Sequence, residues 1–207
     1  MSEIKLYRHP LSGHAHRVEL LLSLLNIDAE IIDVDLMKGE QKSPEFLKKN
    51  PSGQVPALQD GDSYFADSNA ILVYLATKYD SARSWLPTSA EEASEVQKYL
   101  TTAAGAIAFG PAAARLVTLF GAGLDANTAI NTAKNVLGQL NAHLDNREWL
   151  ATDHATIADV ANYAYIAVAP EGNVSLADYP NVNAWLNRIE ALPGFVSMHA
   201  SAVGLAA

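Results

Sequence analysis

The chain of 207 residues contains no cysteine. Without thiols it can form no disulfide, offer no thiolate to a metal and use no protein sulfur as a nucleophile or redox group. Basic residues are also few, since 14 lysines and arginines stand against 23 acids and the formal charge is −9. This negative charge argues against the phosphate backbone of a nucleic acid as the main partner.

Neither a targeting signal nor a membrane span is evident. The N-terminal segment "MSEIKLYRHP" places only a short apolar run between charged residues, which is unlike a signal peptide. The long, mostly uncharged segment at 100–124 carries Arg115 near its middle, at a cost of roughly 2.5 to 3.5 kcal/mol in a bilayer, and the helix-breaking pair Gly110-Pro111. We therefore expect a kinked, buried helix in a soluble protein of the cytoplasm.

Hydrophobic residues make up 49% of the chain, enough for a sizeable core. Up to about residue 80 their spacing alternates between that of strands and that of helices. The pair Asp60-Gly61 is typical of a hairpin turn. The predicted strands lie at 4–7, 29–36, 56–58 and 63–66, and the predicted helices at 17–27, 43–50 and 67–79. This βαβαββα order is typical of a thioredoxin-like α/β domain.

The chain changes character after Tyr79. The polar segment at 81–88 contains a proline and indicates a linker, and beyond it the apolar spacing is helical throughout. We therefore predict an α/β domain at 1–80 and an all-α domain at 89–207.

Several helix boundaries are marked in the second domain. Asp125 can cap a helix that runs to about Leu144. Thr156 can cap another, with Asp159 at the fourth place of a capping box. The amphipathic segment at 181–192 predicts a further helix.

Four short patterns, in this order, resemble one known family. They are "LSGHAHRV" at 11–18, "NPSGQVPAL" at 50–58, "ADSNAI" at 66–71 and "HATIADV" at 154–160. Together they resemble the cytosolic glutathione S-transferases over essentially the whole chain, and in particular the serine-type, theta- and zeta-like bacterial members. The resemblance implies a thioredoxin-like domain that binds glutathione, a helical domain that binds an electrophile, a homodimer and a role in detoxification.

The resemblance assigns the γ-glutamyl end of glutathione to Asp67 and Ser68. These residues open a predicted helix, whose free N–H groups and dipole can hold a carboxylate while Asp67 takes the ammonium group. Helix capping alone would also explain both residue types, and the two roles are compatible.

The same resemblance assigns the rest of the tripeptide. Val55 precedes a proline that is expected to be cis, so that the Val55 backbone can pair with the cysteinyl group like an added strand. Gln54 is expected to reach a carboxylate or amide of the ligand. Gln41 and Lys38 are expected near the glycyl carboxylate, and His14 near the sulfur.

Ser12 is the candidate catalytic residue. Only the thiolate of glutathione is a good nucleophile, and a hydroxyl that donates a hydrogen bond to sulfur at a helix N-terminus favours that anion. Ser12 matches the serine-type pattern, in which Arg17 and Val18 follow. Two alternatives stay open: Ser12 could be only a helix cap, and Tyr7 could supply the hydroxyl, as a tyrosine does in other transferase classes.

The resemblance places the electrophile pocket along the helix that contains Phe109, Arg115 and Phe120, and the second substrate is expected to be apolar. Several classes of the family also use an acid from the partner subunit, and the aligned segment at 101–106 has none.

No metal site is predicted, although three histidines lie close together. His14 and His16 are two residues apart and therefore on different faces of a helix, while His9 precedes that helix and no acidic cluster accompanies them. Glutathione is the cosubstrate that the sequence implies.

Three functions stay open at this level. The first is a transferase that conjugates glutathione to a small apolar electrophile. The second is a non-catalytic member that keeps the fold for protein interaction, suggested by the missing partner acid and by Asp67, where the family more often has glutamate. The third is a glutathione-dependent isomerase, although Gly13 and His14 stand where those enzymes have serine and cysteine.

Overall fold

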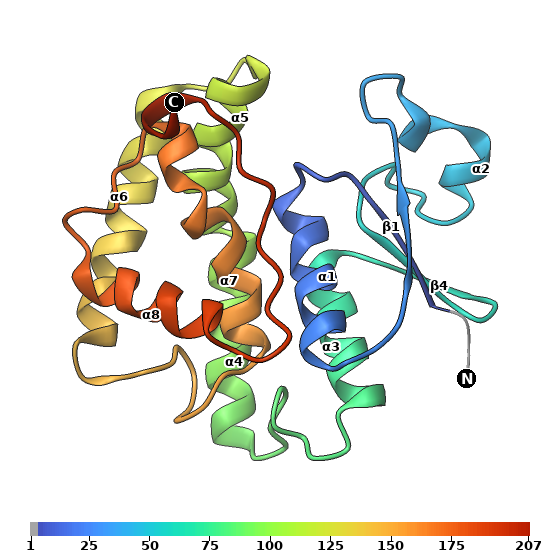
Figure 1. The fold of residues 1–207 in the computed structure, drawn as a ribbon, viewed down its shortest axis with the longest axis horizontal. Helices are drawn as coiled ribbons and strands as arrows, with labels where there is room; N and C mark the ends of the chain where they lie inside the picture. Colours follow the sequence, from blue (N-terminus) through green and yellow to red (C-terminus); the bar gives the residue numbers. More distant parts are fainter. Residues whose placement is uncertain (1–3) are drawn as a thin grey trace.

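The computed structural model describes residues 4–207 and shows a small sheet with its helices beside a larger group of helices (Figure 1). The four strands have the order β2-β1-β3-β4, with β1 parallel to β2 and antiparallel to β3. They are β1 (Ile4–Arg8), β2 (Glu30–Asp33), β3 (Ala57–Asp60) and β4 (Ser63–Ala66). Residues 1–3, with which the predicted first domain begins, lie outside the described part of the chain.

Three helices complete this half, namely α1 (Gly13–Leu24), α2 (Pro44–Leu47) and α3 (Ser68–Tyr79). The predicted βαβαββα order is therefore confirmed. α1 begins at Gly13 rather than at Arg17, because the Ser12 side chain accepts a hydrogen bond from the Ala15 N–H at 3.2 Å and caps the helix.

Beyond Tyr79 the described residues form helices, turns and loops, without a strand. The main helices are α4 (Ala90–Ala104), α5 (Ala113–Phe120), α6 (Ala126–His143), α7 (Ile157–Ala167) and α8 (Pro180–Glu190). The expected caps are confirmed, because Asp125 caps α6, and Thr156 and Asp159 form a capping box at α7. The exact division into two domains stays a prediction.

α1 and α3 lie between the sheet and the helical half (Figure 1). Both pack against α7, which in turn packs against α4. Buried apolar side chains from both halves form one contiguous core, while a small second cluster of Val34, Phe46 and Ala57 includes residues of α2 and β3. The N-terminal ends of α1 and α3 are thus held against the helical half by burial of apolar surface.

The passage from α4 to α5 contains the predicted kink. It is a π turn, η2 (Ala108–Ala112), with Pro111 inside it. Gly110 permits the close approach of α6, since a Cβ there would lie 2.8 Å from the Ala133 nitrogen. By length and composition the stretch at 90–120 could cross a membrane, but this is weak evidence, because core helices of soluble proteins meet the same criterion.

Asp159 connects three segments of the helical half. One carboxylate oxygen accepts from the Leu150 N–H at 3.0 Å and the Trp185 indole N–H at 2.9 Å, and the other accepts from the Thr156 N–H at 2.9 Å. The side chain is 1% exposed, so water cannot replace these bonds. The capping box therefore also fixes α8 and the loop before α7.

We expect Asp159→Ala to lower the free energy of unfolding by about 3 kcal/mol or more, because several buried donors lose their acceptor at once. Asp125→Ala removes an exposed cap of the same residue type and should cost only about 1 kcal/mol. Urea denaturation of both variants measures the difference. Equal losses in the two variants would show that Asp159 acts only as a cap.

Candidate active site

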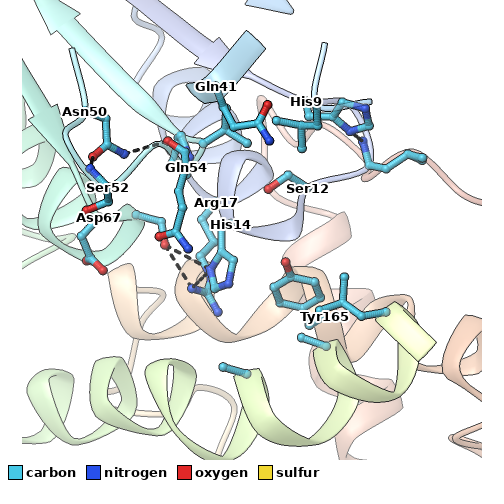
Figure 2. A pocket seen from close by; sticks show the side chains of 18 of the residues that line it. His9, Ser12, His14, Arg17, Gln41, Asn50, Ser52, Gln54, Asp67 and Tyr165 are labelled. Atoms are coloured by element: carbon cyan, nitrogen blue, oxygen red, sulfur yellow. Dashed lines mark hydrogen bonds between the residues drawn. The ribbon is translucent and has the colours of Figure 1, made fainter. Parts of the chain in front are cut away.

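A cavity of about 630 Å³ lies where the N-terminal ends of α1 and α3 meet the helical half (Figure 2). Its polar side is formed by His9, Ser12, His14, Arg17, Gln41, Asn50, Ser52, Gln54, Asp67, Ser68 and Asn69. The helical half contributes a mostly apolar side of Ala104, Ala108, Ala112, Leu116 and Phe120, to which Arg115 and Tyr165 add polar groups. The cavity is suited to a ligand with a polar and an apolar part.

Ser12 lies at the junction of β1 and α1 and lines the cavity. Its oxygen accepts the Ala15 N–H, and no other hydrogen bond of this hydroxyl occurs among residues 4–207. The hydroxyl hydrogen is therefore available to a bound ligand, next to the positive end of the α1 dipole. Capping and catalysis are compatible at this residue, because capping uses the oxygen and leaves the hydrogen.

Tyr7, the alternative hydroxyl, does not belong to the cavity lining. Its hydroxyl donates to the Gln59 side chain at 3.0 Å, and its ring packs edge-on against Phe46. The sequence could not separate Tyr7 from Ser12, since both lie near the end of β1. In the structure Ser12 lines the cavity, whereas Tyr7 contacts Gln59 and Phe46.

Arg17 is a buried cation at the floor of the cavity, with 1% of its surface exposed. One of its terminal nitrogens donates to Ser68 Oγ at 3.1 Å and to His14 Nδ1 at 2.8 Å, and the other donates to the Ala103 carbonyl at 3.4 Å. Within the described chain no carboxylate lies at ion-pair distance from this guanidinium. Burial lowers the pKa of Arg17 to about 10, which still leaves it charged at neutral pH.

His14 is neutral in this arrangement. Burial, followed by the charge of Arg17, lowers the pKa of His14 to about 4. Because a guanidinium can only donate, His14 Nδ1 must accept, and the ring proton lies on Nε2. The ring also contacts Tyr165 edge-on, with the centroids 5.1 Å apart.

Asp67 and Ser68 begin α3 at the polar side of the cavity. Asp67 caps the helix by accepting the Ala70 N–H at 2.9 Å, and its backbone has φ 67° and ψ 120°. This positive φ is unusual for a residue other than glycine and is typical of functional sites, where strain is tolerated. Ser68 is buried and accepts from Arg17, so it connects the start of α3 to the floor of the cavity.

The segment before β3 supplies the neighbouring wall. The Val55-Pro56 bond is cis, as expected from the resemblance. Asn50 shapes the turn, since its side chain donates to the Gln54 carbonyl at 2.7 Å and accepts the Ser52 N–H at 3.0 Å. Gln41, in the 3₁₀ turn η1 (Glu40–Lys42), has a buried side-chain oxygen that finds no partner in the described chain.

Arg115 enters the cavity from α5. Its Nε pairs with Glu171 at 2.5 Å, and one terminal nitrogen donates to the Leu11 carbonyl at 2.7 Å. Glu171, in η4 (Ala169–Gly172), also accepts the Ser201 N–H at 2.8 Å. Arg115 therefore links the loop before Ser12 to the C-terminal segment.

Two predicted site residues lie outside the cavity. Lys38 is exposed and does not line the cavity. Its ammonium group forms an ion pair at 3.0 Å with Asp35 of the same turn. Phe109 is 71% exposed, because the π turn changes which side chains of this helix face the cavity. Gln54, Phe120 and the other expected residues do line it.

Arg17 and Tyr165 are the main residues that sequence reasoning did not place in the site. Arg17 was part of a recognised pattern, and a charge inside the apolar period of a helix could have signalled a buried role. Tyr165 lies in the apolar segment of α7, where nothing in the sequence separates it from the core.

The histidines are divided between different environments. His9 lines the cavity, whereas His16 is buried and its Nε2 donates to the Val196 carbonyl at 2.9 Å. No group of three histidine or acidic side chains in the range 4–207 could hold a metal ion.

Comparison with known proteins gives one consistent result. Residues 2–77 match the family model of the glutathione S-transferase N-terminal domain, and residues 125–193 match that of the C-terminal domain. Glutathione S-transferase 3 of Zea mays is 36% identical over 94% of this chain and 92% of its own length. A zeta-class glutathione S-transferase of Euphorbia esula is 51% identical, over 37% of this chain and 34% of its own length.

Solved structures agree with these matches. A possible glutathione S-transferase of Rhodopseudomonas palustris superimposes with a TM-score of 0.87 and 33% identity, over 96% of this chain and 98% of that one. A glutathione transferase homologue of Drosophila mojavensis, solved with bound glutathione, has a TM-score of 0.85 and 31% identity, over 93% of this chain and 90% of its own.

The lowered pKa of His14 predicts acid sensitivity. Because the folded protein holds His14 with a pKa of about 4 rather than 6.5, the unfolded chain binds this proton more tightly. The free energy of unfolding should therefore fall as the pH drops from 6.5 towards 4, by roughly 1.4 kcal/mol per pH unit for this one group.

Denaturation curves across this pH range test the expectation in His14→Gln. The fall should become shallower but should persist in part, because burial also lowers the pKa of His16. His9→Gln is the matched control, because His9 also lines the cavity but makes no hydrogen bond to Arg17. Identical pH dependence in His14→Gln and the wild type would contradict a neutral, buried His14.

Proposed function

The chain belongs to the glutathione S-transferase family, and from that premise we propose that its cavity binds glutathione and that Ser12 activates the thiol for attack on a small apolar electrophile. The observation that carries the proposal is the Ser12 hydroxyl, which lines the cavity at the N-terminus of α1 and donates to no acceptor among residues 4–207. Detoxification, a cytoplasmic location and homodimers are typical of this family.

The chemistry requires that the thiolate is favoured over the thiol. The Ser12 hydroxyl donates a hydrogen bond to sulfur and the α1 dipole adds positive potential, so both lower the thiol pKa. The thiol proton leaves to solvent and Ser12 keeps its own proton. The thiolate then attacks the electrophilic carbon, a C–S bond forms, and the leaving group departs with its electron pair.

The buried charge of Arg17 supports an anionic end of the ligand at the floor of the cavity. A guanidinium without a carboxylate partner is costly to bury, and a ligand carboxylate near Ser68 would offset that cost. Ser68 and the first N–H groups of α3 can hold the γ-glutamyl carboxylate, and Asp67 can take the ammonium group. The carboxylate of the ligand would thus lie near the Arg17 cation, and its ammonium group near the Asp67 carboxylate.

The remaining tripeptide fits the wall before β3. Val55 would pair with the cysteinyl backbone, Gln54 would contact an amide or carboxylate, and Gln41 would offer its side-chain amide to the glycyl carboxylate. The apolar side at α4 and α5, with Leu116 and Phe120, would then receive the electrophile next to the sulfur.

Ser12→Ala should raise the pKa of bound glutathione by about one to two units and lower kcat/KM at neutral pH by roughly 10- to 100-fold. The readouts are conjugation of chloro-dinitrobenzene and the ultraviolet absorbance of the thiolate. Ser89→Ala is the matched control, because Ser89 caps α4 with the same 3.2 Å bond and lies outside the cavity. Unchanged values in Ser12→Ala would remove Ser12 from the mechanism.

Asp67→Asn should weaken glutathione binding by up to about fivefold, the range expected for an exposed ion pair, while the helix cap is kept. Calorimetric titration measures the dissociation constant. An analogue of glutathione that lacks the α-amino group should bind wild type and variant equally, which isolates the ammonium contact.

The same titration separates the transferase from a non-catalytic member of the family. Binding of glutathione to the wild type must also stabilise the folded state against heat. Neither heat of binding nor stabilisation at millimolar glutathione would favour an interaction protein that has kept only the fold.

A further inference from the structure

Tyr165 brings a phenol from the helical half to the start of α1. The residue lies on α7, lines the cavity and is 7% exposed. A Cβ at Gly13 would lie 2.7 Å from Cε1 and Cζ of Tyr165 and 2.9 Å from Cε2. The hydroxyl end of the ring is therefore in contact with the residue that directly follows Ser12, at a distance that only glycine permits.

The hydroxyl of Tyr165 lies among backbone groups of α1 and beside Arg17. The backbone N–H groups of Gly13 and His14 partly offset the rise in the pKa of Tyr165 that burial causes. The Arg17 guanidinium carbon lies 5.7 Å from the ring centroid. Among the residues that the structure describes, the Tyr165 hydroxyl donates to no acceptor, so its hydrogen is available to a ligand in the cavity.

Figure 2 shows where the hydroxyl oxygen of Tyr165 lies. The hydroxyl of Tyr165 is directed towards the part of the cavity that Ser12 borders, and the two side chains come from opposite halves of the molecule. Two hydroxyl groups that donate to no acceptor among residues 4–207 thus line one space at the N-terminus of α1, where an anion is favoured.

We propose that Tyr165 is a second catalytic hydroxyl, which donates to the glutathione sulfur from the helical half while Ser12 donates from the other side. This inference rests on the proposed function, since it requires glutathione in the cavity. The thiol proton leaves to solvent, and neither hydroxyl gives up its proton. The two O–H groups stabilise the thiolate together until its lone pair forms the bond to the electrophilic carbon.

Burial keeps Tyr165 suited to this role. The net effect of its surroundings is a raised pKa, with burial as the largest cause, so the phenol stays protonated and remains a donor over the range in which the thiol ionises. Arg17 beside the ring and Arg115 are the cations that act on Tyr165, and neutral His14 adds no further charge.

The test uses Tyr165→Phe, which keeps the ring against Gly13 and removes only the hydroxyl. The pKa of bound glutathione, from thiolate absorbance and from the pH profile of kcat/KM, should rise by about one unit, which lowers kcat/KM roughly tenfold below that pKa. The dissociation constant of glutathione, measured where the thiol is protonated, should stay within about twofold of wild type.

Tyr163→Phe is the matched control. Tyr163 lies on the same helix, and its hydroxyl donates to Glu190 at 2.9 Å, away from the cavity. This variant should keep the wild-type pH profile even if it is less stable.

The outcomes separate the two proposals. If Tyr165→Phe keeps the thiol pKa of the wild type, the second hydroxyl is overturned and the role of Ser12 is untouched. A loss of rate that is equal at every pH, with the thiol pKa unchanged, would also overturn it and make Tyr165 a packing residue. If the wild type neither binds nor conjugates glutathione, the proposed function itself fails.

Discussion

The buried charge of Arg17 is the constraint on which the arrangement of the cavity depends. Taking a guanidinium out of water is costly unless its donors are used, and the chain meets this cost with neutral acceptors from separate elements. Ser68 at α3, Ala103 in α4 and His14 in α1 each accept from it. Together with burial, which is the larger cause, the same charge keeps His14 neutral, and it leaves the floor of the cavity positive.

Much of the fold could be predicted because it is encoded by local signals. The caps at Asp125 and Thr156, the proline that opens α2 and the hairpin turn at Asp60-Gly61 involve residues close in sequence. Their physical causes are short-range, so one sequence is enough to find them. The predicted start of α1 at Arg17 is wrong by one turn, because Gly13, His14 and His16 carry no apolar helical spacing although Ser12 caps the helix before them.

The candidate site could be predicted only in part. Pattern resemblance located Ser12, Gln54, Asp67 and Ser68, which line the cavity. It could not show that Lys38 pairs with its own turn or that a π turn directs Phe109 outward, since both depend on side-chain packing. The position of Tyr165 in the cavity could not be predicted for the same reason. Its contact with Gly13 joins residues far apart in the chain, and no pattern in either segment indicates the contact.

The ion pair between Arg115 and Glu171 has a consequence for how this protein could diverge. Glu171 accepts from Ser201, near the C-terminal end, and Arg115 donates to the carbonyl of Leu11, one residue before Ser12. The end of a chain usually tolerates insertion, deletion and substitution well. Here such changes would be transmitted through two buried side chains to the loop before Ser12, so the segment around Ser201 is coupled to the wall of the cavity.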